Sequence, residues 1–533
     1  MPRPTSDQDL VHARPDLQIE PLVHQYYAWL HLVSPAPAAM NFTKLHGPLL
    51  TAFGQAPRLH RTSALDPRLR GGMFVNLPED AVAATAALAE RIAGPDSPSA
   101  RLSGAIDHLT GLAEERADGF DLSPLYAEIP EPLRGYVELA YDMNDHPQLR
   151  FFEHMLYRSP YYDESAQSID LAVHTDDERP FTMTTPRLPG PGHTQVTLPL
   201  RDRRIDDLFA SETGPRKFGE LREALGITAE GREEFARLFT TEPPPPRPAA
   251  SHDTRVRYLG HACVAVESAG VTVVTDPFLA GVPGPERYTQ ADLPDVIDYV
   301  LITHGHQDHL ELGTLLRLRH RIGTIVVPKA AGGTLPDPSL KLCLKALGFD
   351  QVVEAEPGDV LEADGVRIVV CPFMGEHCDL DISAKVTYGV RTADRTLYFA
   401  ADNRGLEPVM FANIRELLGP VDVAFLGMEC DGAPLQWLYG PLFSRRLSSR
   451  KSRSRKLNGC NAAEARTMVE GLGARSAYVY AMGREPWLGF VMATNYTEDS
   501  YQLAQVDEFL RSCHARGLRA GELQGRADIP LDL

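Results

Sequence analysis

The sequence predicts an α/β protein whose C-terminal part is an αββα sandwich, preceded by a mixed α/β N-terminal domain. After residue 253, short segments rich in β-branched residues alternate with segments of helical pattern. The strand segments are too numerous for one ordinary open sheet, which favours two sheets packed face to face with helices outside. The length of 533 residues also calls for more than one domain.

A proline-rich segment marks the boundary between the two parts. The stretch "TTEPPPPRPAASHD", Thr240 to Asp253, contains consecutive prolines that neither a helix interior nor a central strand accommodates. The stiff, extended conformation of such a run suits a linker. We therefore predict three units: an N-terminal domain of residues 1–240, a linker of residues 241–253 and a C-terminal domain of residues 254–533.

The N-terminal unit reads as a mixture of helices and short strands. "LPEDAVAATAALAERIA", from Leu77, contains helix-forming residues with acids in its first turn. The segment from Arg216 to Phe239 predicts two helices broken at Gly226, and short strands are expected near Phe181 and Thr194. We find no metal-ligand or nucleophile pattern in this unit.

Composition limits the partners and the compartment. The net charge of −19 and the pI of about 5.4 disfavour nucleic acid and acidic membranes as partners. No apolar run approaches the roughly 20 residues that a membrane span needs, and the N-terminus lacks a signal-peptide pattern. The seven cysteines include no CxxC pair, which indicates reduced thiols and a cytoplasmic location.

The chemistry is concentrated in "LITHGHQDHL", which follows a predicted strand. His304 and His306, two residues apart at a strand end, can bind one metal ion. Asp308 and His309 follow at once and can bind a second ion beside it. Four ligand-type residues within six positions, in a loop after a strand, predict a metal site.

This HxHxDH pattern resembles the signature of the metallo-β-lactamase fold, and the resemblance covers residues 254–533. Two other marks agree with it. "YLGHACVAVES" and "GVTVVTDPFL" are similar to the opening hairpin of that fold and end at Asp276, which the family places beside the metal loop. Asp402, in "TLYFAADN", is at a strand end where the family has a carboxylate that bridges the metals.

The stretch "FMGEHCDL" leaves one ligand open, because Glu376 and His377 are neighbours. Adjacent side chains of an extended strand point to opposite faces, so only one of them is expected to face the metals. Hydrolases of this fold have a histidine here and a last histidine near the C-terminus. After His377 only His514 remains, within a predicted helix, so the hydrolase set is incomplete even if His377 is a ligand.

With Glu376, the set has three histidines and three carboxylates. Such an oxygen-rich set suits two iron ions that activate O₂ better than zinc that only acidifies water. The alternatives therefore remain a di-iron oxygenase and a zinc-dependent hydrolase of the same fold. The candidate metal ligands are His304, His306, Asp308, His309, Glu376 and Asp402.

Glutamate in this position, the two-domain length and the missing terminal histidine resemble the di-iron β-hydroxylase family of the chloramphenicol pathway. This resemblance extends over the whole chain. It implies that His304, His306 and Glu376 bind one iron, that Asp308 and His309 bind the other, and that Asp402 bridges. Glu376 is thereby also the candidate catalytic residue. The N-terminal domain is implied to mediate homodimerisation.

The family also implies the reaction. It is an O₂-dependent hydroxylation of the β-carbon of p-aminophenylalanine, or a similar aromatic amino acid, held as a thioester on a nonribosomal peptide synthetase carrier domain, in antibiotic biosynthesis. The implied cofactors are two non-heme iron ions, with O₂ as co-substrate. The sequence contains no CxxC pair or dinucleotide fingerprint that would indicate an internal reductase, so electrons are expected from a separate protein.

Three further features follow the last ligand. Glu429, in "GMEC" at a strand end, is a candidate to bind a substrate amino group. "QWLYGPLF" supplies Trp437, Tyr439 and Phe443 as a possible aromatic wall. The basic run from Arg445 to Lys456 has no acid and predicts an exposed loop, which either steers an acidic carrier domain or is only solvated.

Overall fold

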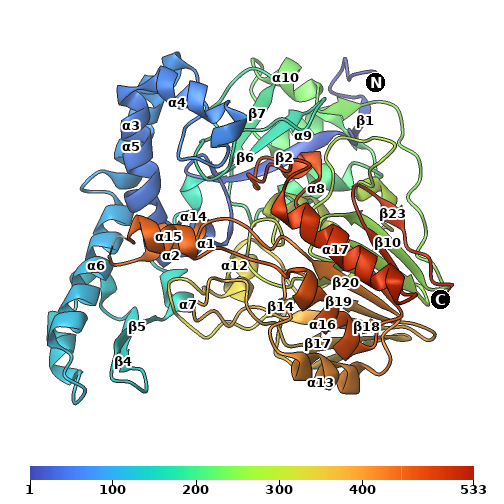
Figure 1. Cartoon of the computed structure of the whole chain (residues 1–533). Coiled ribbons are helices and arrows are strands. Elements are labelled where there is room, and N and C mark those ends of the chain that lie inside the picture. Colours follow the sequence, from blue (N-terminus) through green and yellow to red (C-terminus); the bar gives the residue numbers. More distant parts are fainter. Residues whose placement is uncertain (446, 533) are drawn as a thin grey trace.

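Two seven-stranded sheets face one another in the C-terminal part of the chain (Figure 1). The computed structural model describes residues 1–445 and 447–532, without the side chains of Ser449, Ser452 and Arg453. Helices cover the outer faces of both sheets, so the predicted αββα sandwich is confirmed. The strands are β10 (Arg255–Gly260), β11 (Cys263–Ser268), β12 (Val271–Thr275), β13 (Ile297–Leu301), β14 (Ile322–Pro328), β15 (Val352–Ala355) and β23 (Ala527–Asp528) in the first sheet, and β16 (Val360–Ala363), β17 (Val366–Cys371), β18 (Thr387–Arg391), β19 (Thr396–Phe399), β20 (Val423–Gly427), β21 (Ser476–Tyr480) and β22 (Arg519–Glu522) in the second.

The strand β11 shows how side-chain alternation divides the interior into two cores. Val264 and Val266 pack between the two sheets, in a cluster that includes Phe425. The alternate residues Cys263 and Ala265 face the other way, into a second cluster. Because successive side chains of a strand point to opposite faces, a strand buried on both sides reads as a continuous apolar run.

The outer face of the second sheet is covered by α13 (Pro408–Leu418), α16 (Ala462–Leu472) and α17 (Tyr501–Ala515). The ends of α16 are encoded locally. The Asn461 side chain accepts the N–H groups of the first turn, and Gly473 ends the helix in a left-handed conformation.

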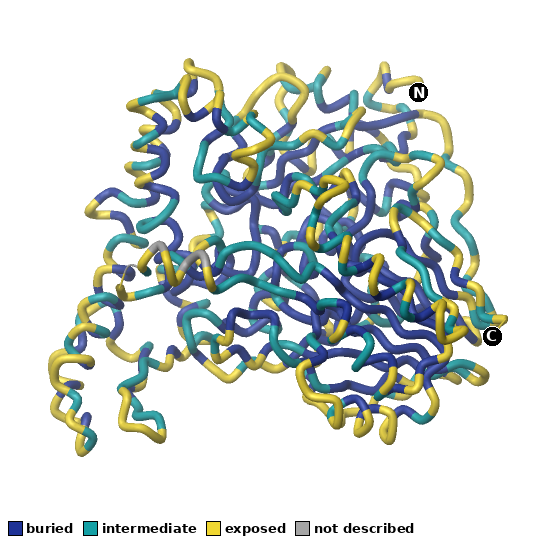
Figure 2. Tube along the Cα trace, in the orientation of Figure 1, coloured by how far each residue is buried: buried dark blue, intermediate teal, exposed yellow. Residues whose placement is uncertain are grey.

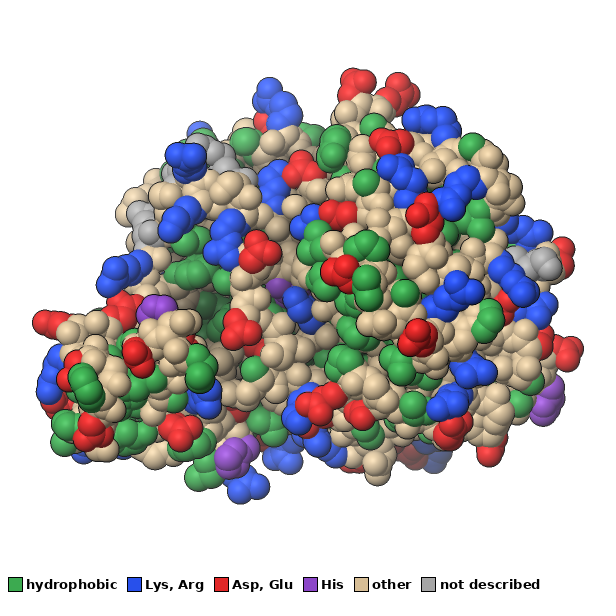
Figure 3. Space-filling model, turned by 60° about the horizontal axis from the view of Figure 1, so that its bottom comes forward, with side chains coloured by type: hydrophobic (Ala, Val, Ile, Leu, Met, Phe, Trp, Pro, Cys, Tyr) green, Lys and Arg blue, Asp and Glu red, His purple; other side chains and the backbone are tan. Residues whose placement is uncertain are grey.

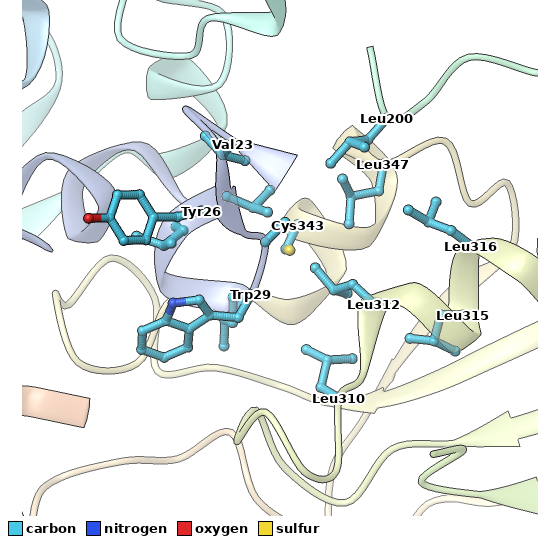
Figure 4. Close-up of a cluster of buried hydrophobic side chains, with 14 of the residues drawn as sticks. Val23, Tyr26, Trp29, Leu200, Leu310, Leu312, Leu315, Leu316, Cys343 and Leu347 are labelled. Atoms are coloured by element: carbon cyan, nitrogen blue, oxygen red, sulfur yellow. The ribbon is translucent and has the colours of Figure 1, made fainter. Parts of the chain in front are cut away.

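The outer face of the first sheet is covered by α11 (Leu312–Leu318), α12 (Leu340–Ala346) and the N-terminal part of the chain. Figure 4 shows Val23, Tyr26 and Trp29 beside leucines of α11 in one apolar cluster. Figure 2 shows that buried residues continue from the sheets into the N-terminal part. Residues 1–240 and 254–533 therefore share a hydrophobic core.

The N-terminal part contains a four-stranded sheet, a three-stranded sheet, a projecting hairpin and a group of helices. Its strands are β1 (Leu10–Ala13), β2 (Leu17–Val23), β3 (Tyr26–Tyr27), β4 (Val137–Tyr141), β5 (Pro147–Phe151), β6 (Gln167–Val173), β7 (His193–Thr197), β8 (Arg216–Lys217) and β9 (Phe239–Thr240), and its helices are α1 (Leu30–Val33), α2 (Pro35–Asn41), α3 (Gly47–Gln55), α4 (Pro57–Ala64), α5 (Val82–Ala93), α6 (Pro98–Arg116), α7 (Glu153–Leu156), α8 (Arg204–Ala210), α9 (Phe218–Ala224) and α10 (Arg232–Ala236).

Most predicted N-terminal elements are confirmed, but one is wrong. The helix predicted after Leu77 is α5, the break at Gly226 separates α9 from α10, and the strand near Thr194 is β7. The strand predicted near Phe181 is instead a turn, closed by the Thr185 N–H donating to the Phe181 carbonyl. This turn packs against the metal loop described below, so tertiary contacts override the local β preference of its threonines.

The proline-rich segment, residues 241–253, contains no helix or strand. It is nevertheless fixed to both parts of the chain. Arg247 forms ion pairs with Glu212 at 2.6 Å and with Asp295 at 2.9 Å. None of the helices in the described part of the chain combines the length and the apolar character needed to span a bilayer.

Candidate metal centre

The loop after β13 carries the HxHxDH pattern, and Asp276 holds it in place. β12 and β13 are parallel neighbours, so their C-terminal ends meet at the same edge of the sheet. Asp276 follows β12 and accepts the Thr303 N–H at 2.8 Å and the Thr303 hydroxyl at 2.6 Å. It also lies 2.8 Å from His309 Nδ1. This contact directs the other ring nitrogen, His309 Nε2, toward the site.

One group of ligand-type atoms comprises three imidazoles and a carboxylate. His304 Nε2 and His306 Nδ1 lie 3.1 Å apart, and His306 Nδ1 lies 3.1 Å from Glu376 Oε1. His377 belongs to the same group by distance. All these side chains are buried, so the group forms an enclosed, metal-sized cluster of N and O atoms.

A second group lies beside the first and shares Asp402 with it. His309 Nε2 lies 3.3 Å from Asp402 Oδ2 and 3.5 Å from Asp308 Oδ2. The same Asp402 oxygen lies 3.9 Å from His304 Nε2. Asp402 therefore reaches both groups. The structure brings all six predicted ligands together at one edge of the sandwich.

The donor atoms fit metal ions. His309 Nε2 and Asp402 Oδ1 are buried and have no hydrogen-bond partner among the residues that the structure describes. A buried polar atom without a partner is costly, and a metal ion would supply the missing interaction. Nitrogen and carboxylate oxygen in this ratio suit iron as well as zinc.

The charges of the site also favour cation binding. Burial alone would lower the pKa of His309, but Asp308, Asp402 and Asp276 raise it well above its usual value. For His304, burial and the neighbouring imidazoles lower the pKa well below the usual value. Three carboxylates around a buried imidazole concentrate negative charge, which a pair of cations would neutralise.

The expectation that Glu376 and His377 lie in an extended strand and point to opposite faces was wrong. β17 ends at Cys371, so both residues are in the loop that follows it, and Glu376 has a left-handed backbone with φ +69°. Strand alternation therefore does not apply. His377 Nδ1 contacts Glu376 Oε2, so both side chains lie on the same side. Glu376, unlike His377, also lines the cavity beside the site.

That cavity lies over the two groups and reaches Glu429. Thr494 donates to Glu429 Oε1 at 2.8 Å. Burial raises the pKa of Glu429 well above its usual value, even though part of its surface faces the cavity. The lining is otherwise largely apolar and includes Met183, Ala433, Trp437, Leu438, Leu457, Val491 and Met492.

The predicted aromatic wall is only partly present. Trp437 lines the cavity. Tyr439 is buried, and its hydroxyl lies 3.0 Å from His306 Nε2, so it supports a candidate ligand from behind. Phe443 packs against the large apolar core and does not line the cavity. Trp437 and Tyr439 belong to α14 (Gln436–Tyr439).

Sequence reasoning missed His261. Its ring is fully buried, and His261 Nε2 lies 3.1 Å from Asp308 Oδ2. With Asp308 and His309, it forms a third group of ligand-type atoms. The dipeptide Gly260–His261 at a strand end was visible in the sequence, but nothing local indicates that it meets a loop more than 40 residues away.

Sequence reasoning also missed the N-terminal contribution to the site. Thr182 donates its hydroxyl to Gln307 Oε1 at 2.9 Å, and Gln307 lies between two candidate ligands. Met183 lines the cavity. Leu30 packs so closely on Gly305 that a Cβ there would lie 2.5 Å from Leu30 Cδ2. Residues 1–240 thus help to shape the metal loop.

The basic run divides into structural and exposed residues. Arg445 pairs with Glu114 at 2.7 Å, Arg455 Nε donates to the Cys378 carbonyl at 2.9 Å, and Lys456 pairs with Asp431. The exposed cations, Arg450 and Lys451, are on α15 (Ser449–Ser454). Arg446 and the side chain of Arg453 lie outside the described residues.

Comparison with known proteins identifies the relatives. Residues 13–243 match the diiron non-heme β-hydroxylase N-terminal domain, and residues 272–434 match the β-lactamase superfamily domain. The chain is 37% identical to 4-amino-L-phenylalanyl-[CmlP-peptidyl-carrier-protein] 3-hydroxylase of Streptomyces venezuelae, over 97% of this chain and 99% of that protein. The crystal structure of CmlA, a diiron β-hydroxylase from S. venezuelae, matches with a TM-score of 0.92 at 36% identity, covering 98% of this chain and 100% of that one.

Hydrolase relatives match only in part. A metal-dependent hydrolase of Methanopyrus kandleri is 35% identical over 22% of this chain and 46% of its own length. The zinc-hydrolase alternative is accordingly the less supported one, and the resemblance seen in the sequence is confirmed. With more than a third of the residues identical along nearly the full length of both chains, the protein belongs to the diiron non-heme β-hydroxylase family.

Proposed function

We propose that this protein is an O₂-dependent non-heme di-iron monooxygenase that hydroxylates the β-carbon of an aromatic amino acid, p-aminophenylalanine or a close analogue, tethered as a thioester to a nonribosomal peptide synthetase carrier domain in antibiotic biosynthesis. The observation that carries this proposal is the ligand set. It has three imidazoles and three carboxylates, lacks the last histidine of the hydrolases, and lies on a chain that aligns from end to end with a carrier-protein 3-hydroxylase.

The two groups described above suggest the ligand assignment. His304, His306 and Glu376 would hold one iron ion, and Asp308 and His309 the other. Asp402 would bridge them, since its Oδ2 is within 3.9 Å of an imidazole nitrogen from each group. When bound, the iron ions would supply the O₂ chemistry of C–H hydroxylation, with electrons from a separate donor protein.

The chain's own residues would bind and orient the aminoacyl group. Glu429 is at the cavity wall with a raised pKa, so an incoming ammonium group would favour its carboxylate form and pair with it. That pairing would fix the amino acid by its α-nitrogen and hold the β-carbon toward the ligand cluster. Apolar side chains, among them Leu438 and Val491, would keep water away from the reacting carbon.

Entry of an aromatic ring requires side-chain movement. The cavity has a free volume of about 70 Å³, well below the several hundred Å³ typical of ligand pockets. Met183 and Met492 line it, and unbranched methionine side chains change rotamer easily. We propose that these two residues move aside when the substrate enters.

The experiment that tests the function uses the purified, iron-loaded protein, a chemical reductant and ¹⁸O₂. We expect one ¹⁸O atom in the aminoacyl group of the loaded carrier domain, detected by mass spectrometry, and about two irons per chain. The free amino acid, as the matched control, should turn over far more slowly. Zinc in the protein together with release of the unmodified amino acid from the carrier would instead establish the hydrolase.

Docking of the carrier domain is proposed to involve α15. Carrier domains are commonly acidic around the attachment serine, and a basic surface speeds encounter with an acidic partner. Arg450 and Lys451 are exposed, and α15 is next in the chain after α14, which lines the cavity through Trp437. Arg450 and Lys451 are therefore the residues whose mutation tests docking. Arg455 and Lys456 are less suitable for mutation because they make structural contacts.

Replacing Arg450 and Lys451 with serine should lower kcat/KM for the carrier-bound substrate several-fold at low salt and flatten its dependence on ionic strength. The matched control replaces the exposed pair Arg216 and Lys217 on β8, which changes the net charge equally. The control should behave as the unmodified protein does, and neither variant should lose iron. Equal kinetics for the two variants would remove α15 from the docking surface.

Residues 1–240 are proposed to mediate homodimerisation. α6 and the β4–β5 hairpin project from the molecule (Figure 1), and Figure 3 shows apolar and acidic side chains on this projection. Near its end, Phe120 is 89% exposed and Met143 is 98% exposed. Sedimentation of the variant with serine at both positions tests this, because an unchanged dimer would exclude the projection.

Seven free thiols support a reducing compartment such as the cytoplasm.

A further inference from the structure

The turn between β10 and β11 presents His261 in a strained conformation. Gly260 has φ +113° and His261 has φ +51°. A residue with a Cβ pays a steric penalty in the left-handed region, which persists only where the surroundings enforce it. Trp487 covers the turn, since a Cβ on Gly260 would lie 2.4 Å from Trp487 Cζ2. The backbone is thus held so that the His261 ring enters the metal centre.

The segment after β21 makes the hydrogen bonds that hold His261. The backbone N–H of His261 donates to Glu485 Oε1 at 3.0 Å, and the His261 carbonyl accepts the Ala481 N–H at 3.1 Å. The Gly483 N–H donates to His261 Nδ1 at 3.3 Å. Residues 481–487, which follow β21, contain no histidine of their own. This segment instead supplies groups that hold a histidine from another strand.

These contacts fix which ring nitrogen of His261 carries the proton. A backbone N–H can only donate, so His261 Nδ1 must accept and has no hydrogen. The hydrogen of the neutral ring is then on Nε2, which lies 3.1 Å from Asp308 Oδ2. His261 Nε2 therefore donates to Asp308, and its lone pair is not available to a metal ion.

We propose that His261 is a positioning residue for the second metal ion: it does not bind the ion, and it fixes the carboxylate of Asp308 through an Nε2–H donor whose tautomer is set by Gly483. The His261 ring also lies 5.0 Å from that of His309, centroid to centroid, so it restricts both ligands of this group. Partners of this kind typically change metal affinity 10- to 100-fold when they are removed.

The proposal rests on the proposed function only in that Asp308 is taken as a ligand. The test at position 261 is independent of turnover, since it measures metal binding and not hydroxylation. A protein that binds two metals but hydroxylates nothing would refute the function and leave this inference intact. Conversely, hydroxylation with metal binding insensitive to position 261 would refute the inference alone.

The test compares His261→Asn with His261→Gln in the full-length protein. Asparagine tolerates the left-handed backbone well but is too short to reach Asp308. Glutamine places an amide N–H close to where His261 Nε2 lies. We expect the asparagine variant to bind one metal ion as the unmodified protein does and the other 10- to 100-fold more weakly, in a competition titration with a chromophoric chelator. The glutamine variant should retain both ions.

The two variants separate a positioning role from a packing role. If His261 only maintained the fold, the asparagine variant would be at least as good as the glutamine variant, because its backbone is less strained. Equal retention of both ions by the asparagine variant overturns the proposal. Loss of an ion from both variants also overturns it, since that would identify His261 as a direct ligand.

A double-mutant cycle with Asp308→Asn adds a test that does not depend on the rescue. If His261 acts through Asp308, the effects of His261→Asn and Asp308→Asn on the affinity for the second ion should be strongly non-additive. Additive effects would show that His261 acts by another route. Thermal unfolding of the metal-free variants, recorded alongside, should remain close to that of the unmodified metal-free protein.

Discussion

A chain that begins at residue 252 should fail to fold, because the first sheet of the sandwich shares its outer core with residues 1–240. The leucines on and beside α11 pack directly against N-terminal side chains (Figure 4). Leu310, Leu312, Leu315 and Leu316 are each at most 1% exposed. Each would gain water contact when its N-terminal neighbours are absent, at a cost of up to about 1.5–3 kcal/mol. Together, these costs are comparable with the whole net stability of a typical domain, about 5–15 kcal/mol.

Charged groups would add to this loss. Arg317 contacts Glu212 at 2.7 Å, and Arg319 contacts Asp206 at 2.7 Å; the arginines are buried. Removing one partner of a buried pair leaves an uncompensated charge, which typically costs about 3–5 kcal/mol. The metal loop would also lose Leu30 and Thr182, which pack on it and hydrogen-bond to it.

The measurement is the far-ultraviolet circular dichroism, the thermal unfolding and the metal content of the fragment starting at residue 252. The matched control is the full-length protein cut by a protease at a site engineered among the linker prolines. Its two pieces should stay associated, with the metals bound, because the non-covalent core is unchanged. A soluble, cooperatively unfolding fragment that binds two metals would show that the shared core is not required.

The contrast between linker and core shows what local sequence can reveal. A run of prolines identifies a segment that is neither helix nor strand, and residues 241–253 are of this kind. It does not reveal whether the flanking parts pack against each other. The apolar face of α11 must be covered, but the sequence does not say by what. Here the cover is β2 and α8, which precede it by a hundred residues or more.

The candidate site was predictable to the extent that it is local. One loop after a single strand contains His304, His306, Asp308 and His309, so their proximity follows from the local sequence alone. Met183 and His261 reach the site from distant parts of the chain, and no local sequence pattern predicts their position there. The left-handed backbone of Glu376 is a further case, because it depends on how the loop packs after β17 and not on the strand that precedes it.

Glu376 and His377 offer two ligands at one position, and mutation should separate them. Glu376 Oε1 lies 3.1 Å from His306 Nδ1, and its carboxylate lines the cavity. Burial would raise its pKa, but His306 and His377 lower it well below the usual range, so the group is anionic beside the imidazoles. His377 contacts Glu376 from behind. We therefore expect Glu376 to bind the metal and His377 to hold the carboxylate in place.

Replacing Glu376 with Gln should accordingly remove one metal ion and reduce hydroxylation by more than about 100-fold, beyond the 10- to 100-fold typical of residues that only support a ligand. Glutamine keeps the size of the side chain, so the loss would report the missing charge and ligand. The matched change, His377→Gln, removes the imidazole while keeping a donor, and should leave two ions bound with a smaller loss of rate. Metal content and single-turnover hydroxylation, measured on both variants, distinguish the roles. The reverse pattern would be loss of metal from His377→Gln and retention of metal in Glu376→Gln. That result would identify His377 as the ligand. The ligand set would then be closer to that of the hydrolases, and zinc would be the expected metal.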